Sequence, residues 1–293
     1  MERRVGGQQG PQGSLGIERP APDGAIRQAL VVALGTIGAG WLATGLWAAE
    51  PAGGSPNEQV IAVELKQLSD PTILKRRAWL ETEWNKYKDG THDMEETLGG
   101  LWAWRVSTNQ DWAVRLKVPY EWHIAGDAAG DSDDQGLGDI KLATGTALRL
   151  SDSWRVGGGL ELRMPTAEDD LGDKDWRLQE FGAVAWDATR WLTLSPSVEY
   201  NESLAEESGG AQQHYVEAFF PATFLLPHRW SVTPKYEAKV DFKNDNYVTH
   251  SSKLSLAKQL HKLPLGFSLS IKKSFDGGDK EFQVNFVITW HFR

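Results

Sequence analysis

Apolar side chains occupy every second position in the stretch that runs from Glu281 to Phe292, next to Arg293. Successive side chains of an extended strand point to opposite faces, so these apolar side chains share one face. They are Phe282, Val284, Phe286, Ile288, Trp290 and Phe292. The pattern predicts a strand with one apolar face that ends in aromatic rings.

The same alternation recurs upstream, most regularly from Trp112 to Trp122. One face of that stretch carries Trp, Val, Leu and Tyr, whereas the other face carries mainly charged residues. The stretch from Trp230 to Phe242 repeats this arrangement. Strands with an apolar face and tryptophan or tyrosine near their ends are typical of bacterial outer-membrane β-barrels. A soluble β-sandwich would place aliphatic residues on its inner faces instead.

Alternation and turn signals together predict twelve strands. They are expected at 76–87, 94–106, 111–124, 138–150, 154–165, 176–186, 190–200, 212–226, 229–242, 246–260, 264–275 and 280–292. The strands at 176–186, 190–200, 212–226 and 246–260 alternate imperfectly. Phe181 and Trp186, for example, cannot share a face without a bulge, so the inward residues of these four strands cannot be assigned.

Short and long links alternate between the predicted strands. The short links are 108–110, 151–153, 187–189, 227–228 and 261–263, and the longer, Asp/Glu/Gly-rich links include 126–137, 166–175 and 201–211. Bacterial barrels have short periplasmic turns and longer external loops. We therefore expect an all-β fold: a transmembrane antiparallel up-and-down barrel of about twelve strands over residues 76–293, in the bacterial outer membrane, with both ends of the barrel chain periplasmic.

The first part of the chain is expected to direct export. Residues 29–49 are uncharged and mostly apolar and end in small residues, so 1–49 is interpreted as a signal peptide with a long, Gly/Pro-rich n-region. An uncleaved membrane anchor is the alternative, because the run is long enough to span a bilayer.

Residues 50–75 are expected to form a periplasmic lead-in with a short helix. Val60, Ile61, Val63 and Leu68 recur at helical spacing before Asp70 and Pro71 interrupt the pattern. The alternative is a plug that enters the barrel.

Composition excludes several classes of protein. The chain has no cysteine, which rules out disulfides and thiolate metal sites, and its formal net charge of -9 argues against a nucleic-acid partner. Asp127, Asp131, Asp133 and Asp134 lack the remaining residues of a calcium loop, so no metal and no cofactor are expected. The expected partners are outer-membrane lipid and lipopolysaccharide, the barrel-assembly machinery through the last strand, and a small-molecule solute.

Two motifs carry a family resemblance. Gly136-Leu-Gly138-Asp139-Ile-Lys-Leu142, and Gly158-Gly-Leu-Glu-Leu-Arg-Met-Pro165-Thr166 before an Asp/Gly-rich loop, resemble the outer-membrane transporter family named for the meta-pathway of phenol degradation. The resemblance implies an outer-membrane barrel that transports solutes. From the residues themselves, Gly136 and Gly138 suit a tight entry into a strand and Asp139 suits the capping of backbone N–H groups, so a structural role is favoured.

The clearly alternating strands also assign the inward residues. We expect the lumen to be lined by Arg115, Lys117, Glu121, Lys141, Arg149, Arg155, Glu161, Arg163, Lys235, Glu237, Lys239 and Asp241. Eight of these side chains are positive and four are negative, which predicts a modest preference for anions in a confined passage. Salt bridges that simply fill the lumen are the alternative.

The predicted function is passive uptake of small solutes, with aromatic compounds as one candidate class. The first alternative is a non-conducting barrel with a structural or surface-interaction role. The second is a lipid-modifying enzyme, because His250 and Ser252 share a strand face with the spacing of the outer-membrane phospholipase. Lys253 and Leu254 replace the Asn-Gly that follows the serine in that enzyme, so no enzyme activity is expected.

Overall fold

The computed structural model describes residues 56–67, 69–124, 134–168, 171–206, 212–275 and 280–292. They belong to one compact unit, Ala48–Arg293. The predicted signal peptide, the acidic cluster from Asp127 to Asp133, and Arg293 lie outside the described residues, so those predictions stay as they are.

One helix and fourteen strand segments follow one another along the described chain. They are α2 (Pro56–Lys66), β1 (Arg77–Tyr87), β2 (His92–Ser107), β3 (Gln110–Ile124), β4 (Asp134–Leu137), β5 (Lys141–Arg149), β6 (Trp154–Arg163), β7 (Asp175–Thr189), β8 (Leu192–Leu194), β9 (Ser197–Glu206), β10 (His214–Leu226), β11 (Trp230–Asp241), β12 (Tyr247–Gln259), β13 (Leu265–Ser274) and β14 (Lys280–His291), with a 3-10 turn at Pro227–Arg229.

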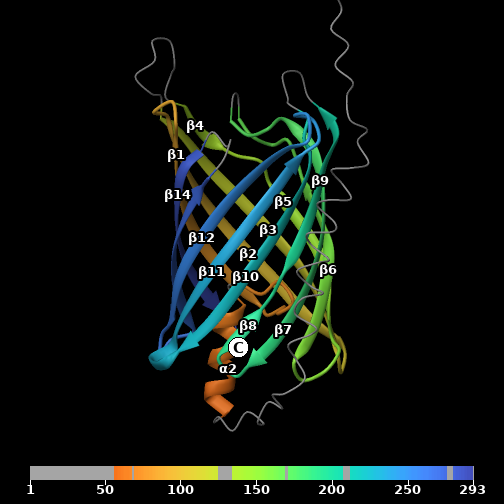
Figure 1. Ribbon diagram of the computed structural model, residues 1–293, viewed down its shortest axis with the longest axis vertical. Coiled ribbons are helices and arrows are strands. Elements are labelled where there is room, and N and C mark those ends of the chain that lie inside the picture. Colours follow the sequence, from red (N-terminus) through yellow and green to blue (C-terminus); the bar gives the residue numbers. More distant parts are fainter. Residues whose placement is uncertain are drawn as a thin grey trace, which may run out of the picture. The chain divides into compact units, whose positions relative to one another are not determined.

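The strands form a closed antiparallel barrel (Figure 1). Both β4 and β5 pair with β3, and both β8 and β9 pair with β7 and β10, so each of these two pairs of segments is one interrupted strand. The ring of pairings is continuous from β1 to β14 and back to β1. The barrel therefore has twelve strands, and the predicted fold class and all twelve predicted strands are confirmed.

The outer face of the barrel carries many exposed apolar side chains. Leu98, Leu254 and Ile271, for example, are 63%, 57% and 55% exposed. A closed ring leaves no strand edge, so every spanning strand can satisfy its backbone groups where no water is present. An apolar exterior around a closed barrel is the arrangement of outer-membrane barrels, and it places this chain in the bacterial outer membrane.

The two ends of the barrel differ in their connections. Turns at 108–109, 150–153, 190–191, 227–229 and 260–264 lie at the end that holds α2 and the C-terminus (Figure 1). The opposite end carries the connections at 88–91, 164–174 and 242–246. Within the described ranges, no helix is long and apolar enough to cross a membrane.

Strand β7 is more regular than its sequence suggests. Phe181 points into the barrel and contacts inner-wall glycines, whereas Trp186 points outward and stacks on Trp154. The two side chains lie on opposite faces, and the β6–β7 pairing runs from Trp154 to Arg163 without a bulge. The imperfect alternation arises because an aromatic ring occupies an inward position.

The orientation of the barrel can be tested with single cysteines, because the chain has none of its own. Lys88 in the β1–β2 turn and Asp152 in the β5–β6 turn are both exposed and lie at opposite ends. We expect Lys88→Cys to react with a membrane-impermeant maleimide on intact cells, and Asp152→Cys to react only after the outer membrane is opened. The opposite labelling pattern would contradict the predicted periplasmic turns.

Candidate functional site

The lumen is lined by the polar faces of the strands. The twelve predicted lumen residues occupy the inward positions of β3, β5, β6 and β11, and Arg149 is exposed at the end of β5. Several of them pair with one another. Arg115 lies 2.6 Å from Glu161, and Lys235 lies 2.5 Å from Glu237, which also accepts a hydrogen bond from Ser251. Much of the inward charge is thus neutralised within the wall.

Strands other than the four used for the lumen prediction add acidic groups. Inward positions of β1, β2, β9 and β10 carry Glu81, Glu83, Glu95, Glu199 and Glu217, as the register with β14, β3 and β11 shows. The eight-to-four excess of positive charge came from four strands alone. Other strands also add inward basic groups, such as Arg177, Lys253 and Lys272, so the tally from four strands does not give the charge of the whole lumen, and the anion preference stays a prediction.

Asp139 fixes the loop between β6 and β7. Its buried carboxylate accepts hydrogen bonds from the backbone N–H groups of Thr166, Ala167 and Asp173, each within 3.1 Å, and from Arg163 Nε at 3.0 Å. The expected capping role of Asp139 is therefore seen, although the capped N–H groups belong to a loop about thirty residues further on. The Asp139 carboxylate thus holds that loop against the barrel.

The other motif residues lie around the Asp139 carboxylate. A Cβ on Gly138 would lie 2.2 Å from Glu121 Oε1, and one on Gly136 would lie 2.6 Å from Glu168 Oε2. Thr166 Oγ1 accepts a hydrogen bond from Ile140 N at 2.9 Å, and Pro165 precedes it in the loop. The two motifs thus meet in space and build one loop attachment, which is a structural role.

Asp173, in the same loop, pairs with Arg163 and Arg177. Burial alone would raise the pKa of the Asp173 carboxyl, but the two guanidinium groups hold the pKa below its ordinary value. A carboxyl with a lowered folded-state pKa stabilises the fold at neutral pH, and this contribution is lost only as the pH falls through that lowered pKa.

Replacing Asp139 with alanine is expected to detach the loop. Arg163 then loses one ion-pair partner, and three backbone N–H groups lose their hydrogen-bond acceptor. Removing one partner of a buried ion pair typically destabilises the fold by about 3–5 kcal/mol. Limited proteolysis on intact cells should then cut between 164 and 174, while the wild type stays resistant. Asp134→Ala, at the start of β4, is the matched control and should remain resistant. Equal cleavage of both variants would contradict the role of Asp139 in holding the loop.

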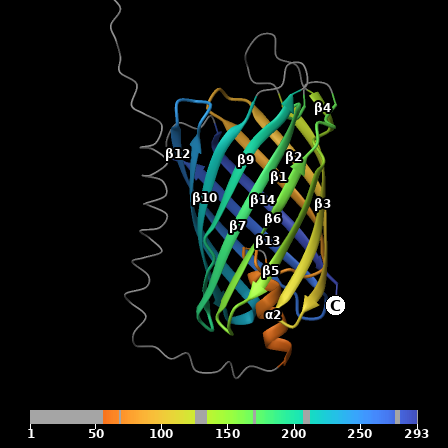
Figure 2. The same ribbon diagram turned by 90° about the vertical axis from the view of Figure 1, so that its right-hand side faces the viewer.

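A segment from Val60 to Lys75 enters the mouth of the barrel and is called the plug here (Figure 2). Lys66 Nζ lies 2.7 Å from Asp187 Oδ1 on β7. Arg155 on β6 bridges the same carboxylate at 2.6 Å and the Asp70 carboxylate at 2.9 Å, and the Asp70 side chain is 1% exposed. This four-membered ion network ties the plug to one side of the wall.

Further contacts hold the plug on other strands. Ser69 Oγ hydrogen-bonds to Thr223 Oγ1 on β10 at 2.6 Å, and its carbonyl oxygen accepts a hydrogen bond from Ser195 Oγ at 3.3 Å. Leu65 is buried with Ala257 on β12 and packs against Leu225 on β10. Partners therefore come from β6, β7, β10 and β12, so the plug contacts several strands around this mouth. The boundaries predicted for the lead-in, 50–75, stay a prediction.

Small side chains make room for the plug. A Cβ on Gly157 would touch Thr72 at 3.5 Å, and Ala147, Ala183 and Ala185 are buried on the same inner wall. Gly157 thus lies within contact distance of Thr72 in the plug. The inner wall of β5, β6 and β7 therefore carries small side chains at several buried positions.

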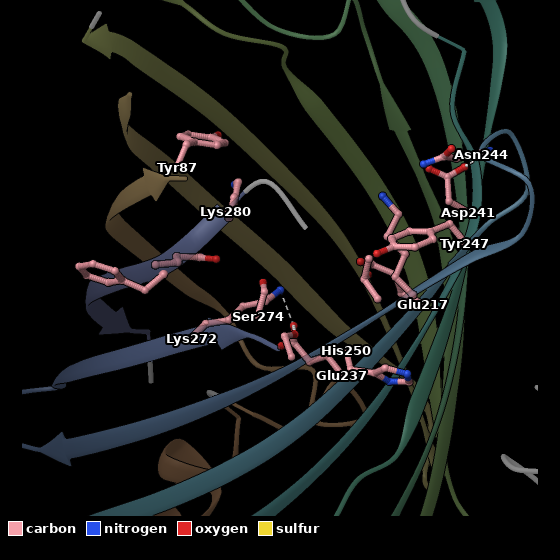
Figure 3. A pocket seen from close by; sticks show the side chains of 15 residues that line it. Tyr87, Glu217, Glu237, Asp241, Asn244, Tyr247, His250, Lys272, Ser274 and Lys280 are labelled. Carbon is pink, nitrogen blue, oxygen red and sulfur yellow. Dashed lines mark hydrogen bonds and ion pairs between the residues drawn. The ribbon is translucent and has the colours of Figure 1, made fainter. Parts of the chain in front are cut away.

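A cavity of about 440 Å³ lies in the half of the lumen away from the plug (Figure 3). Lys272 and Lys280 reach it from β13 and β14, whereas Glu217 and Asp241 reach it from β10 and β11 on the other side (Figure 3). Glu237 lies at its floor and pairs with Lys272. Cavities of about 300–1,000 Å³ are typical of small-molecule sites, but those sites are usually lined by apolar groups. The charged lining here favours a polar occupant.

His250 and Ser252 lie on the outer face of β12. His250 Nδ1 is 2.7 Å from the Tyr236 hydroxyl, and Ser252 is paired with Tyr236 in the β11–β12 register. The side chains of Tyr236 on β11 and His250 on β12 therefore both point outward. Among the described residues, no group of acidic or histidine side chains could hold a metal ion.

Models of protein families and curated proteins gave no match to this chain. Among solved structures, the chain is similar to the COG4313 outer membrane channel from Pseudomonas putida F1, with a TM-score of 0.64, 13% identity, and coverage of 74% of this chain and 95% of that one. The NanC porin matches with a TM-score of 0.51, 11% identity, and coverage of 74% and 99%. The translocator domain of the autotransporter NalP from Neisseria meningitidis matches with a TM-score of 0.51 and 12% identity, and the match covers 80% of this chain and 96% of that one. These likenesses support the barrel fold.

Proposed function

We propose that this protein is a passive outer-membrane channel for small polar solutes, closed at one mouth by the plug. The observation that carries the proposal is a charged lumen with a cavity of about 440 Å³, together with a plug held at one mouth by the Lys66, Asp70, Arg155 and Asp187 network. A plug held by a few polar contacts can leave, whereas a packed apolar core cannot be emptied without unfolding.

The size of the barrel supports passage of small solutes. Barrels of about eight strands are filled by side chains and those of about sixteen leave a wide channel. Twelve strands lie between these limits, so selectivity depends on the inward side chains. Membership of the phenol meta-pathway transporter family is part of the proposal, but the charged cavity favours polar solutes over aromatic hydrocarbons.

The alternatives are weaker on the same observations. A purely structural barrel needs no cavity and no plug with its own ion network. A lipid-modifying enzyme needs an activated serine, whereas His250 forms its hydrogen bond with the hydroxyl of Tyr236. Outer-membrane lipid and lipopolysaccharide around the barrel, and the assembly machinery acting on β14, remain the proposed partners.

Conductance in a planar bilayer tests the channel. We expect the refolded full-length protein to give small, intermittent steps in KCl, because the plug closes the mouth most of the time. Protein that shows heat-modifiable migration on gels, and is thus folded, but gives no steps even when the plug has been released would contradict the proposal.

A further inference from the structure

The charges that line the cavity are arranged with opposite signs on facing walls (Figure 3). Lys280 lies on β14, with Lys272 beside it on β13, and Glu217 lies on β10, with Asp241 beside it on β11. Tyr87 and Tyr247 flank the two walls. The side formed by β13 and β14 is basic, whereas the side formed by β10 and β11 carries the two carboxylates together with Lys239.

Some of these groups are already satisfied by the protein. Glu237 is shared among Lys235, Lys272 and Ser251, and Lys239 lies over the Tyr215 ring at 3.7 Å from its centroid. Asp241 Oδ1 accepts hydrogen bonds from the N–H groups of Lys243 and Asn244, which leaves Oδ2. These contacts fix the charges of the floor and of the acidic wall.

The two groups that remain for a solute have opposite charge. Glu217 lines the cavity, and Lys239, its cross-strand neighbour, lies over the Tyr215 ring and not on the Glu217 carboxylate. Lys280 Nζ lies 3.8 Å from a Glu83 carboxylate oxygen and 5.8 Å from the centroid of the Tyr87 ring, and its side chain is 43% exposed. A partly dehydrated carboxylate on one wall and an ammonium with only distant partners on the other can both gain from a charged solute.

We propose that the cavity binds small solutes that carry a positive and a negative charge at separate ends. The ammonium end meets Glu217 and Asp241, and the carboxylate end meets Lys280 and Lys272. A solute with one charge satisfies one wall and leaves the other unpaired, so it gains about half of the interaction. This inference deepens the proposed channel function, because it assigns a solute class to the same lumen.

Equilibrium binding tests the inference without requiring an open channel. The folded full-length protein in detergent is titrated with 4-aminobutyrate, butyrate and n-butylammonium, three solutes of similar length, by calorimetry at low ionic strength. We expect 4-aminobutyrate to bind about tenfold more tightly than either single-charge solute, because one more charge-assisted hydrogen bond is made. Equal binding of all three, or no binding, would overturn the proposal.

Two variants assign the ends of the solute. Glu217→Gln should reduce 4-aminobutyrate binding to the level of butyrate, and Lys280→Met should reduce it to the level of n-butylammonium. The matched controls are Glu96→Gln, on the outer face of β2, and Lys262→Met, in the β12–β13 turn, and both should bind like the wild type. Lys280 is partly exposed, so its replacement tests the inference even where Glu217→Gln does not fold.

The outcome is independent of the proposed function. A protein that conducts KCl but binds the three solutes equally is a channel without this preference. A protein that binds 4-aminobutyrate selectively but does not conduct carries the binding site without being a channel.

Discussion

Replacing Arg155 with alanine is expected to release the plug and to raise the open fraction of the channel by more than about a hundredfold. Arg155 is the partner of the buried Asp70 carboxylate and shares Asp187 with Lys66. Removing one member of a buried ion pair costs about 3–5 kcal/mol, because the remaining charge is uncompensated. Since about 1.4 kcal/mol changes an equilibrium tenfold, the docked state should lose its advantage.

Single-channel recording measures this release, and an introduced cysteine reports on the plug itself. Leu65 is 3% exposed and makes apolar contacts, so Leu65→Cys should react slowly with a thiol reagent in the wild-type background. Adding Arg155→Ala should make the reaction fast. The control is Arg149→Ala, which removes an exposed arginine at the same end of the barrel. Unchanged conductance, together with a thiol that stays protected at position 65, would show that the ion network does not hold the plug.

Replacing Gly159 with alanine is expected to prevent normal folding of the barrel. A Cβ at this inward position of β6 would lie 2.2 Å from the Thr144 carbonyl oxygen, 2.6 Å from Gly145 Cα and 2.8 Å from Phe181 Cζ. Backbone atoms cannot move aside as a side-chain end can, so β5 and β6 would have to separate. Overpacking typically costs about 1–3 kcal/mol, and disruption of the strand pairing adds to it.

Heat-modifiable migration of the outer-membrane fraction measures this effect. The matched control is Gly182→Ala on the neighbouring strand β7, where an added Cβ has no atom within 4 Å. We expect the Gly182 variant to fold normally and the Gly159 variant to remain in the unfolded band. Normal folding of both variants would show that the inner wall tolerates larger side chains.

Local alternation predicted the strands well, because in a barrel the facing of each residue depends on its position along one strand. The segment from Trp112 to Trp122 needed no other information to give the inward Arg115, Lys117 and Glu121. The same reasoning could not assign the facing of Phe181. Its ring points inward because it fills space left by Gly145 and Gly159 on two other strands. The sequence pattern within one strand does not show where glycines on neighbouring strands leave space for a large side chain.

Long-range pairing limited the prediction of the site. The plug was foreseen as an alternative, yet the choice depends on Asp187 and Arg155, which lie far along the chain from Lys66 and Asp70. The inward Glu199 and Glu217 could not be assigned, so the prediction of selectivity lacked the acidic wall. Asp139 was recognised as a capping residue because a short motif carries that signal.

The ion network of the plug also sets an order of events during assembly. Lys66 and Asp187 are 121 positions apart, and Asp70 and Arg155 are 85 apart. The plug emerges before any strand, but its partners exist only when β6, β7 and β10 have been inserted and lie side by side. The first described segment to be synthesised therefore cannot complete its ion network until β6 and β7 are in place.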